Sequence, residues 1–176
     1  MKPLRTEVAF RTPWFDLRAK TMREGEPPYY SVRPPDYTAA IALTADRRVV
    51  MVRQYRPAVE RYTLELPSGL VDPGETPEQA MRRELLEETG YEAGELEPLG
   101  SMTPDAGRLE TRIWNFFAPE VKPAAGRHPE EGIEVRLYGL SELADMIVSG
   151  QFDHALHIAP FLPALLRGRL KFGKPG

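Results

Sequence analysis

One segment constrains the fold of this chain more than any other: residues 69–91, which read GLVDPGETPEQAMRRELLEETGY. A glycine-containing loop leads into a stretch with the start and stop signals of a helix over Pro77–Thr89. Thr76 can cap its first turn, Gln79 can complete a capping box, and Gly90 can end it. The sequence therefore predicts a loop–helix unit that is fixed to the rest of the domain through the apolar residues of the helix.

The predicted helix carries several acids on one face. Glu84 and Glu88 are four residues apart and Glu84 and Glu87 three apart, so all three project within about 100° of arc at 3.6 residues per turn. Like charges at this spacing repel one another, which makes sense if cations lie on that face. Mg²⁺ prefers carboxylate oxygens and usually shares its coordination with water and substrate phosphates. The face indicates a platform for Mg²⁺ and pyrophosphate, with a solvated acidic helix face as the alternative.

The complete spacing favours the first interpretation: Gly69, five residues, Glu75, seven residues, then Arg83-Glu84-Leu85-x-Glu87-Glu88-x-Gly90. At background frequencies of about 5–7% per residue, this pattern matches by chance at on the order of 10⁻⁹ per start position. The segment resembles the Nudix box of Nudix hydrolases and departs from it only at Tyr91, where the strict pattern has an aliphatic residue. The resemblance implies an α+β fold, a three-layer α/β/α sandwich with a mixed sheet, and hydrolysis of a nucleoside diphosphate linked to another group.

The resemblance also implies which residues hold the metal. Glu84 and Glu88 are the expected ligands, and Glu87 is expected to contribute directly or through water. The backbone carbonyl of Ser68 is a further candidate, since hard cations accept such oxygens. Mg²⁺ is the expected ion, with Mn²⁺ as a substitute.

Two other pairs of charged residues have expected roles. A carboxylate and a guanidinium can pair through two hydrogen bonds, so Glu75 and Arg83 are expected to hold the loop to the helix. Hydrolysis also needs a base that orients and deprotonates water. The related enzymes often carry this glutamate in the loop expected at 119–132, two residues before an apolar β residue. Glu131 fits that position as the catalytic base, and Glu130 is the neighbour to test beside it.

The stretch before the box resembles the ADP-ribose and nucleotide-sugar pyrophosphatase branch of the family. It reads RQYRP at 53–57 and LELPSG at 64–69, and Pro104 lies where that branch carries a proline. A guanidinium can grip phosphate with two hydrogen bonds, so Arg53, Arg56 and Arg108 are candidate substrate contacts. ADP-ribose, cut to AMP and ribose 5-phosphate, is the predicted substrate. Since Pro104 is followed by Asp and not by the usual Gly, ADP-glucose, GDP-mannose or another nucleotide sugar stays open.

Two further alternatives belong to other functional classes. One is a hydrolase of modified nucleoside triphosphates, which the extra N-terminal segment and the stretch before the box disfavour. The other is a regulator that kept a Nudix fold and binds its ligand without turnover. Such a protein is expected to lose box carboxylates, and this chain keeps all of them.

The first 35 residues are expected to form a separate small antiparallel sheet. Runs typical of strands at 7–11, 15–22 and 29–32 precede a break at Arg33-Pro34-Pro35-Asp36, which predicts an N-terminal segment at 1–35 and a Nudix domain at 36–176. In the related branch such a sheet swaps across a homodimer and helps to hold the adenine. The resemblance therefore implies a homodimer with Trp14 and Tyr29, and beside them Tyr30, as base contacts. Packing of a small sheet is the alternative for these aromatics.

The remaining pattern predicts a mixed sheet between helices and not a regular βαβ repeat. Strands are expected at 37–43, 48–55, 63–66, 96–102, 112–117 and 133–137. A helix is expected over Glu142–Ser149, capped by Ser141, and another from His154 toward Arg167. His154 and His157 are interpreted as structural helix residues, because the sequence pairs them with no obvious acid.

Composition excludes several classes of protein. The net charge of −3 disfavours a duplex-DNA binder, which must neutralise phosphates. The absence of cysteine excludes disulfides, thiolate metal sites and cysteine nucleophiles. No stretch approaches the roughly 20 apolar residues of a membrane helix, and the N-terminus lacks the apolar core of a signal peptide. A soluble, cytoplasmic enzyme that binds a small nucleotide, and neither nucleic acid nor membrane, is expected.

Overall fold

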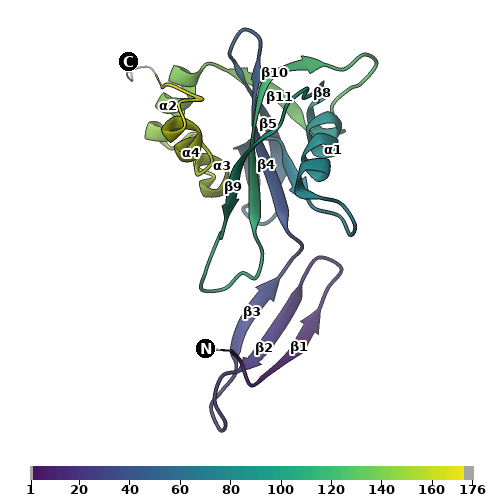
Figure 1. Ribbon diagram of the computed structural model, residues 1–176, viewed down its shortest axis with the longest axis vertical. Coiled ribbons are helices and arrows are strands. Elements are labelled where there is room, and N and C mark those ends of the chain that lie inside the picture. The colour runs from purple at the N-terminus through teal and green to yellow at the C-terminus, as the bar shows by residue number, and fades with distance from the viewer. Residues whose placement is uncertain (1, 173–176) are drawn as a thin grey trace.

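A mixed eight-stranded sheet forms the centre of the computed structural model, which describes residues 2–172 (Figure 1). The strands β4 and β10 pair in parallel, and the other strand pairs are antiparallel. The main path is β11 (Glu134–Tyr138), β5 (Val49–Arg56), β4 (Tyr37–Thr44), β10 (Ile113–Pro123) and β8 (Tyr91–Glu92). Three more strands pair with β5, β4 and β10, respectively: β6 (Arg61–Glu65), β7 (Ser68–Leu70) and β9 (Glu97–Met102).

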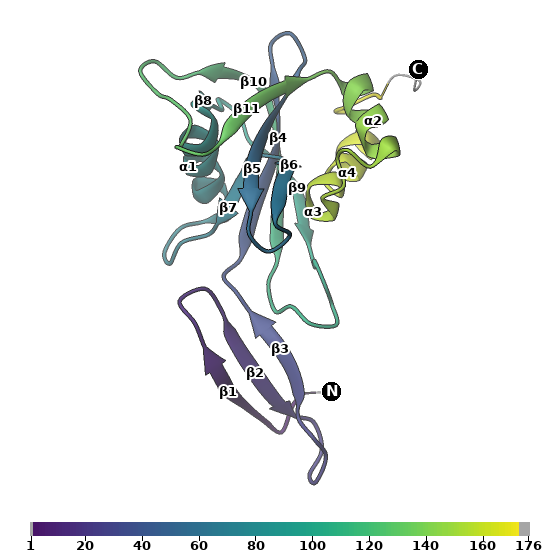
Figure 2. The same cartoon turned by 180° about the vertical axis from the view of Figure 1, so that it is seen from behind.

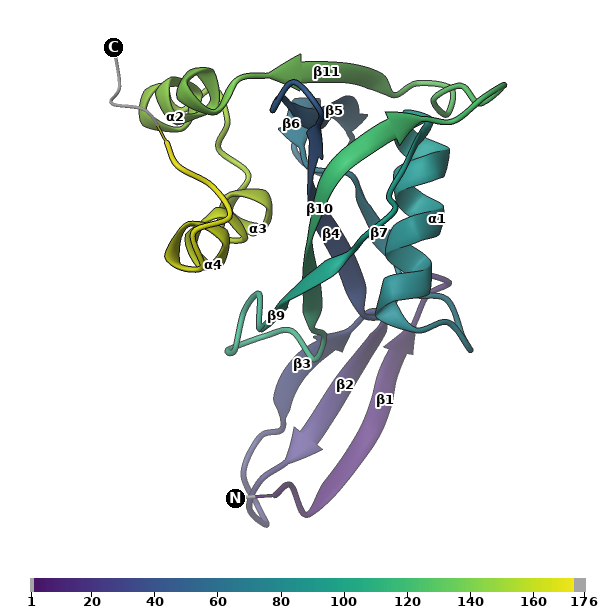
Figure 3. The ribbon, with the colours of Figure 1, turned by 45° about the horizontal axis from the view of Figure 1, so that its top comes forward.

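Helices cover both faces of this sheet (Figure 3). One face carries α1 (Pro77–Thr89), and the other carries α2 (Leu140–Ser149), α3 (Ala155–Ile158) and α4 (Phe161–Leu166). Successive strand residues point to opposite faces, so Ala40 and Ala42 pack in the cluster of α1, whereas Ile41 and Leu43 pack with the residues of α2 and α4. The predicted α+β fold with three α/β/α layers is therefore confirmed. Within residues 2–172, no helix is both long and apolar enough to cross a membrane.

The helix α1 has the bounds that its sequence signals predict. The Thr76 hydroxyl accepts from the Gln79 N–H at 3.2 Å, and the Gln79 side chain accepts from the Thr76 N–H at 2.8 Å. The helix ends where Gly90 takes a φ of 71°, a left-handed conformation that favours glycine. Met81 and Leu85 are fully buried against the sheet, and each contributes about 1.5–3 kcal/mol of burial free energy. These contacts fix the acidic face of α1 relative to β7.

The N-terminal strands form a second sheet beyond one end of the main sheet (Figure 2). The antiparallel strands are β1 (Arg5–Arg11), β2 (Asp16–Thr21) and β3 (Tyr29–Arg33), as predicted. The link to the main domain is polar: Lys20 lies 2.7 Å from Glu110, and Val32 exchanges backbone hydrogen bonds of 2.8 and 2.9 Å with Arg108 and Glu110. The division at residue 35 stays a prediction, and its outer ends, Met1 and residues 173–176, lie outside the described residues.

The strand β10 is longer than predicted. The sequence places its end at Phe117 and a loop from Pro119, but the strand continues to Pro123. A bulge after Ala118 accommodates the proline, with Glu120 at a φ of 50°, and Val121 then pairs with Thr44 of β4. Proline is tolerated in a strand at such bulges because no ladder hydrogen bond is lost there.

The C-terminal helices also differ from the prediction. Gly139 and not Ser141 is the N-cap of α2, and Ser141 lies inside the first turn. The single helix expected from His154 is two short helices, α3 and α4, separated at Pro160. Proline lacks the N–H that a continuous helix would need at this point, but Pro163 is tolerated in the first turn of α4. The short strands β7 and β8 were not predicted, because two or three residues carry no alternation signal.

Candidate metal and diphosphate site

The acidic face of α1 lies against the loop that precedes it. Glu88 is 5% exposed, and its Oε2 accepts a 2.8 Å hydrogen bond from the backbone N–H of Ser68. The Glu84 carboxylate lies directly over Gly69, since a Cβ built at that glycine would come within 2.1 Å of it. The Ser68 hydroxyl accepts a 2.6 Å hydrogen bond from Tyr37. The structure thus brings Ser68, Glu84 and Glu88 together where β7 meets α1.

The electrostatics of these two carboxylates suit a cation. Burial raises the pKa of Glu88 to about 8, the Ser68 N–H opposes this shift, and the charge of Glu84 adds to it. Burial also raises the pKa of Glu84, against the effect of Arg83. Among residues 2–172, no Lys or Arg forms an ion pair with Glu88. Two partly desolvated carboxylates are hard oxygen donors that fit Mg²⁺, and the Ser68 carbonyl stays a predicted third ligand.

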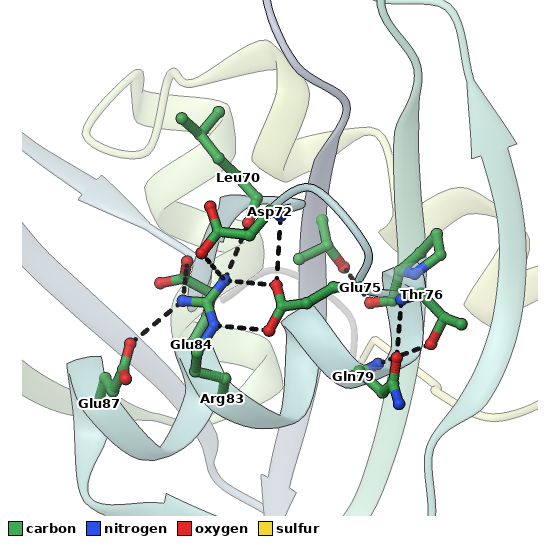
Figure 4. A network of polar contacts seen from close by, with 10 residues as sticks. Leu70, Asp72, Glu75, Thr76, Gln79, Arg83, Glu84 and Glu87 are labelled. Carbon is green, nitrogen blue, oxygen red and sulfur yellow. Dashed lines mark hydrogen bonds and ion pairs between the residues drawn. The ribbon is translucent and has the colours of Figure 1, made fainter.

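Arg83 organises the outer side of this cluster (Figure 4). Its guanidinium holds Glu75 through two hydrogen bonds of 3.0 and 2.9 Å, as the sequence predicts, and donates to the Leu70 carbonyl at 3.1 Å. The same group contacts Glu84 at 2.7 Å and Glu87 at 3.2 Å. Glu87 is half exposed and turned toward Arg83. Arg83 therefore ties the loop to the helix and fixes the Glu84 carboxylate.

Glu131 lies in the loop between β10 and β11, which passes the C-terminal end of α1. The backbone N–H of Glu130 donates to the carbonyl of Glu87 at 3.0 Å, and this contact anchors the loop to the helix. Glu131 itself is exposed, and its side chain forms no hydrogen bond or ion pair with the part of the chain that the structure describes. The loop is thus tethered to α1 at Glu130, the neighbour of Glu131, and the role of Glu131 as the base stays a prediction.

The two arginines before the box bind carboxylates of this chain. Arg53 pairs with Glu134 at 2.8 Å and lies over the Tyr62 ring at 4.0 Å from its centroid. Arg56 pairs with Glu65 through two hydrogen bonds of 2.8 and 2.7 Å. The sequence reasoning missed Glu65, which is fully buried. No local signal marks it, because strand alternation places Glu65 on the face opposite Leu64 and Leu66, and apolar residues are the ones expected to face the core.

Removal of Arg56 is expected to destabilise the fold. The Arg56→Ala variant leaves the buried Glu65 carboxylate without its cation, which costs about 3 kcal/mol in the free energy of unfolding. Urea unfolding measures this loss. The matched control is Arg53→Ala, whose partner Glu134 is partly exposed and whose loss is expected to stay below about 1 kcal/mol. Equal losses for both variants would contradict the buried pair.

Glu65 also lies beside His157, which corrects the expectation that no acid accompanies the histidines. His157 Nε2 is 3.5 Å from Glu65 Oε2, and the His154 ring packs edge-on at 4.1 Å. The three side chains could geometrically hold a metal ion. However, His157 Nδ1 accepts a 2.9 Å hydrogen bond from the Leu66 N–H, so the proton of the neutral ring resides on Nε2. That tautomer has no lone pair facing Glu65, so this cluster is a poor metal site.

Acid is expected to destabilise the protein through His157. Burial, helped by His154 and opposed by Glu65, lowers the His157 pKa from 6.5 to about 3. The neutral ring therefore contributes stability that is complete above pH 6.5 and is lost as the pH falls toward 3, by up to about 1.4 kcal/mol per pH unit. Tyr37 and Arg56 also face the ring. Glu65 adds to this loss of stability only at a pH below its ordinary pKa, because hydrogen bonds from Arg56 and Thr63 outweigh burial and hold its pKa at about 2.

Urea unfolding between pH 7 and 5 tests this expectation. The difference in stability between the wild type and His157→Asn should shrink as the pH falls, because the variant lacks the titrating ring. A difference that stays constant over this range would show that His157 does not titrate as its burial predicts.

The other predicted substrate contacts lie away from the glutamates. Arg108 donates to the Tyr29 hydroxyl at 3.0 Å, with its guanidinium 5.4 Å from the ring centroid, and the Tyr29 hydroxyl contacts the Gly107 carbonyl. Trp14 is 70% exposed and lies in the turn between β1 and β2. Within the described part of this one chain, no hydrogen bond or ring contact joins Trp14 or Tyr29 to the acidic face.

A largely apolar pocket of about 230 Å³ opens beside the loop before α1. Tyr37 and Leu70 connect it to the acidic cluster, through the Ser68 hydroxyl and the guanidinium of Arg83 respectively. Its remaining wall is formed by Pro34, Pro35, Pro104, Leu109, Thr111, Ile113, His154, Leu156 and His157. The site therefore combines an acidic face with an adjacent, largely apolar cavity.

Comparison with known proteins agrees with this geometry. The chain is 35% identical over 119 residues to a methanol dehydrogenase activator from Bacillus methanolicus, covering 66% of this chain and 64% of that protein. It is 36% identical over 90 residues to an ADP-ribose pyrophosphatase from Bacillus subtilis, covering 51% and 49%. This chain thus spans less than two thirds of the length of either relative.

A solved structure described as an ADP compounds hydrolase has the same fold, with a TM-score of 0.80 over 96% of each chain at 23% identity. The sequence model of the NUDIX domain matches residues 34–164, which include the loop, α1 and most of the main sheet. Because that match covers most of the chain, the protein belongs to the Nudix family, as the box at residues 69–91 predicts.

Proposed function

We propose that this protein is a Mg²⁺-dependent pyrophosphohydrolase that cuts ADP-ribose into AMP and ribose 5-phosphate. The observation that carries the proposal is the buried Glu88 carboxylate beside Glu84 and Ser68, with no cationic partner in residues 2–172. The similarity to an ADP-ribose pyrophosphatase and the apolar pocket next to the acidic face support the substrate. Glu84, Glu88 and the Ser68 carbonyl would hold the metal, and Glu87 would contribute through water.

The residues around the diphosphate position and activate a water molecule. Mg²⁺, or Mn²⁺ in its place, would neutralise phosphate charge and lower the pKa of the attacking water. Glu131 accepts one proton of that water, whose oxygen forms a bond to one phosphorus while the bridging P–O bond breaks. Arg83 keeps the Glu84 carboxylate over Gly69 during this step, and the second phosphate leaves with the bridging oxygen.

The base is tested by two neighbouring variants. Glu131→Gln is expected to lower kcat by about 10²-fold or more, as expected for loss of a general base, without changing Mn²⁺ affinity. Glu130→Gln is the matched control, because it shares the loop and charge but is expected to keep near-normal kcat. If both keep normal kcat, the base lies elsewhere, for example in the box itself.

The N-terminal segment 1–35 is proposed to form a homodimer and to cap the substrate. Its apolar side chains Leu4, Val8, Phe10 and Trp14 are each more than 40% exposed in the single chain, which supports burial against a second copy. Trp14 and Tyr29 would stack on the base. Arg53 and Arg108 would contact the phosphates after exchanging their present partners, and Arg56 would contact them while Glu65 holds its other guanidinium nitrogens. A Trp14→Ala variant should raise KM, and sedimentation should give a dimer; an unchanged KM would assign Trp14 to packing.

The substrate is tested by a panel of ADP-ribose, ADP-glucose, GDP-mannose, UDP-glucose, NADH and a nucleoside triphosphate with Mg²⁺. The highest kcat/KM is expected for ADP-ribose. A higher value for ADP-glucose or GDP-mannose would keep the mechanism and change the substrate. Release of inorganic pyrophosphate from the triphosphate as the fastest reaction would indicate a nucleotide-pool enzyme. Binding without any product would indicate a regulator.

A further inference from the structure

The segment Leu66–Ser68, which carries one proposed metal ligand, has few backbone partners of its own. The strand β6 ends at Glu65 and β7 begins at Ser68, so Leu66 and Pro67 lie between two ladders. Pro67 has no N–H, and its carbonyl accepts from the Ala40 N–H at 3.1 Å. The Leu66 N–H is buried and is satisfied by a side chain, His157 Nδ1, at 2.9 Å. A histidine thus replaces the missing strand partner.

This segment is held from both helical layers of the sandwich. On one side, Glu88 of α1 accepts the Ser68 N–H at 2.8 Å. On the other side, His157 of α3, 91 residues away in sequence, accepts a hydrogen bond from the Leu66 N–H. Figure 1 shows α1 and α3 on opposite faces of the sheet. The position of the Ser68 carbonyl therefore depends on anchors in two separate elements.

The surroundings of His157 restrict the position of its ring. The ring is 1% exposed, and the edge of the His154 ring and the edge-on Tyr37 ring, at 4.1 and 6.3 Å between centroids, limit its rotation. Its Nε2–H faces the Glu65 carboxylate, which also accepts both hydrogen bonds of Arg56. One imidazole therefore touches the backbone on the metal side and the acid that orients a proposed phosphate-binding arginine.

We propose that His157 is a positioning residue for the metal-binding loop. Its Nδ1 fixes the Leu66 backbone, and through it the Ser68 carbonyl. Its Nε2 lies 3.5 Å from Glu65, the acid that binds Arg56, and limits the positions open to that carboxylate. The proposal rests on the proposed function, in which that carbonyl and Arg56 face the metal and the diphosphate. His157 contacts neither group itself. Loss of residues that orient metal ligands typically costs 10- to 100-fold in metal affinity or activity, which sets the expected size of the effect.

The test separates the hydrogen bond from the space that the ring fills. His157→Asn keeps an acceptor near the Nδ1 position, whereas His157→Gln moves the amide toward Nε2 and His157→Leu removes both polar atoms. The Leu and Gln variants are expected to bind Mn²⁺ more weakly and to have a kcat lowered by about 10- to 100-fold. Electron paramagnetic resonance measures the Mn²⁺ affinity. Asn is expected to stay within about threefold of the wild type, because the acceptor is restored. The matched control is Leu143→Ala, which removes buried apolar volume from the same core cluster but no hydrogen-bonding group.

Hydrogen exchange of the Leu66 amide reports the contact directly. Exchange is expected to accelerate at least tenfold in Gln and Leu, and to stay near the wild-type rate in Asn and in Leu143→Ala after correction for global stability. If His157→Leu does not fold, Gln and Asn still give the comparison. Unchanged exchange and Mn²⁺ affinity in Gln, or an Asn variant as impaired as Gln, would overturn the proposal. A wild type that binds Mn²⁺ but cuts no substrate would overturn the proposed function alone, since exchange and Mn²⁺ binding do not depend on turnover.

Discussion

Replacing Glu84 and Glu88 together by glutamine is expected to lower kcat by on the order of 10³-fold or more. Glu88 is buried and Glu84 is partly buried, and a bound metal that neutralises phosphate charge contributes several kcal/mol to the transition state. The rate of AMP formation at saturating Mg²⁺ measures the loss. The free energy of unfolding should rise or stay unchanged, because glutamine avoids the desolvation of the two carboxylates and the repulsion between them.

The control for this double variant is Glu78→Gln, on the same helix but exposed and paired with Arg82 at 3.0 Å. Its kcat is expected to match that of the wild type. Thermal unfolding of all three proteins separates a lost site from a lost fold. A double variant that keeps its melting temperature and more than a tenth of the wild-type kcat would show that these acids do not hold the metal.

The Gly69→Ala variant is expected to lower kcat by about 10²-fold with little change in stability. A Cβ at this position would lie 2.1 Å from the Glu84 carboxylate, so that side chain must move. The backbone at Gly69 is not in the left-handed region, so alanine adds no backbone strain. The displaced group is the end of a flexible side chain, which makes the move inexpensive for folding. A misplacement of about 1 Å in a reacting site can nevertheless cost 10²-fold in rate.

Two comparisons test this mechanism for Gly69. Gly94→Ala is the matched control, because a Cβ there meets no atom within 4 Å and its kcat should not change. In a Glu84→Gln background, adding Gly69→Ala should cost much less than it does alone, since both changes remove the same carboxylate. Full additivity of the two losses would mean that Gly69 acts by another route.

The parts of this fold that depend on local signals could be predicted from the sequence. The bounds of α1 follow from Thr76, Gln79 and Gly90, whose capping contacts involve neighbouring residues only. The continuation of β10 past Pro119 could not be predicted, because the bulge at Glu120 depends on pairing with β4 and β8. The break of the last helix at Pro160 is a local effect, because proline lacks the N–H of a continuous helix.

The acidic face could be predicted for the same reason, and its surroundings could not. Glu84 and Glu88 share a face because of helical periodicity, and Ser68 is close in sequence. The Arg56–Glu65 pair depends on how the hairpin β5–β6 twists, and the Leu66–His157 contact joins residues 91 apart. Neither interaction leaves a local pattern, so His157 was expected to be only a helix residue.

The most direct test of the central claim is product analysis of ADP-ribose incubated with the purified protein, with Mg²⁺ and with excess chelator. Cleavage into equal amounts of AMP and ribose 5-phosphate in Mg²⁺, and none in chelator, is the predicted result. Intact ADP-ribose after incubation of folded protein with Mg²⁺, or equal cleavage in both conditions, would contradict a metal-dependent pyrophosphohydrolase of this substrate.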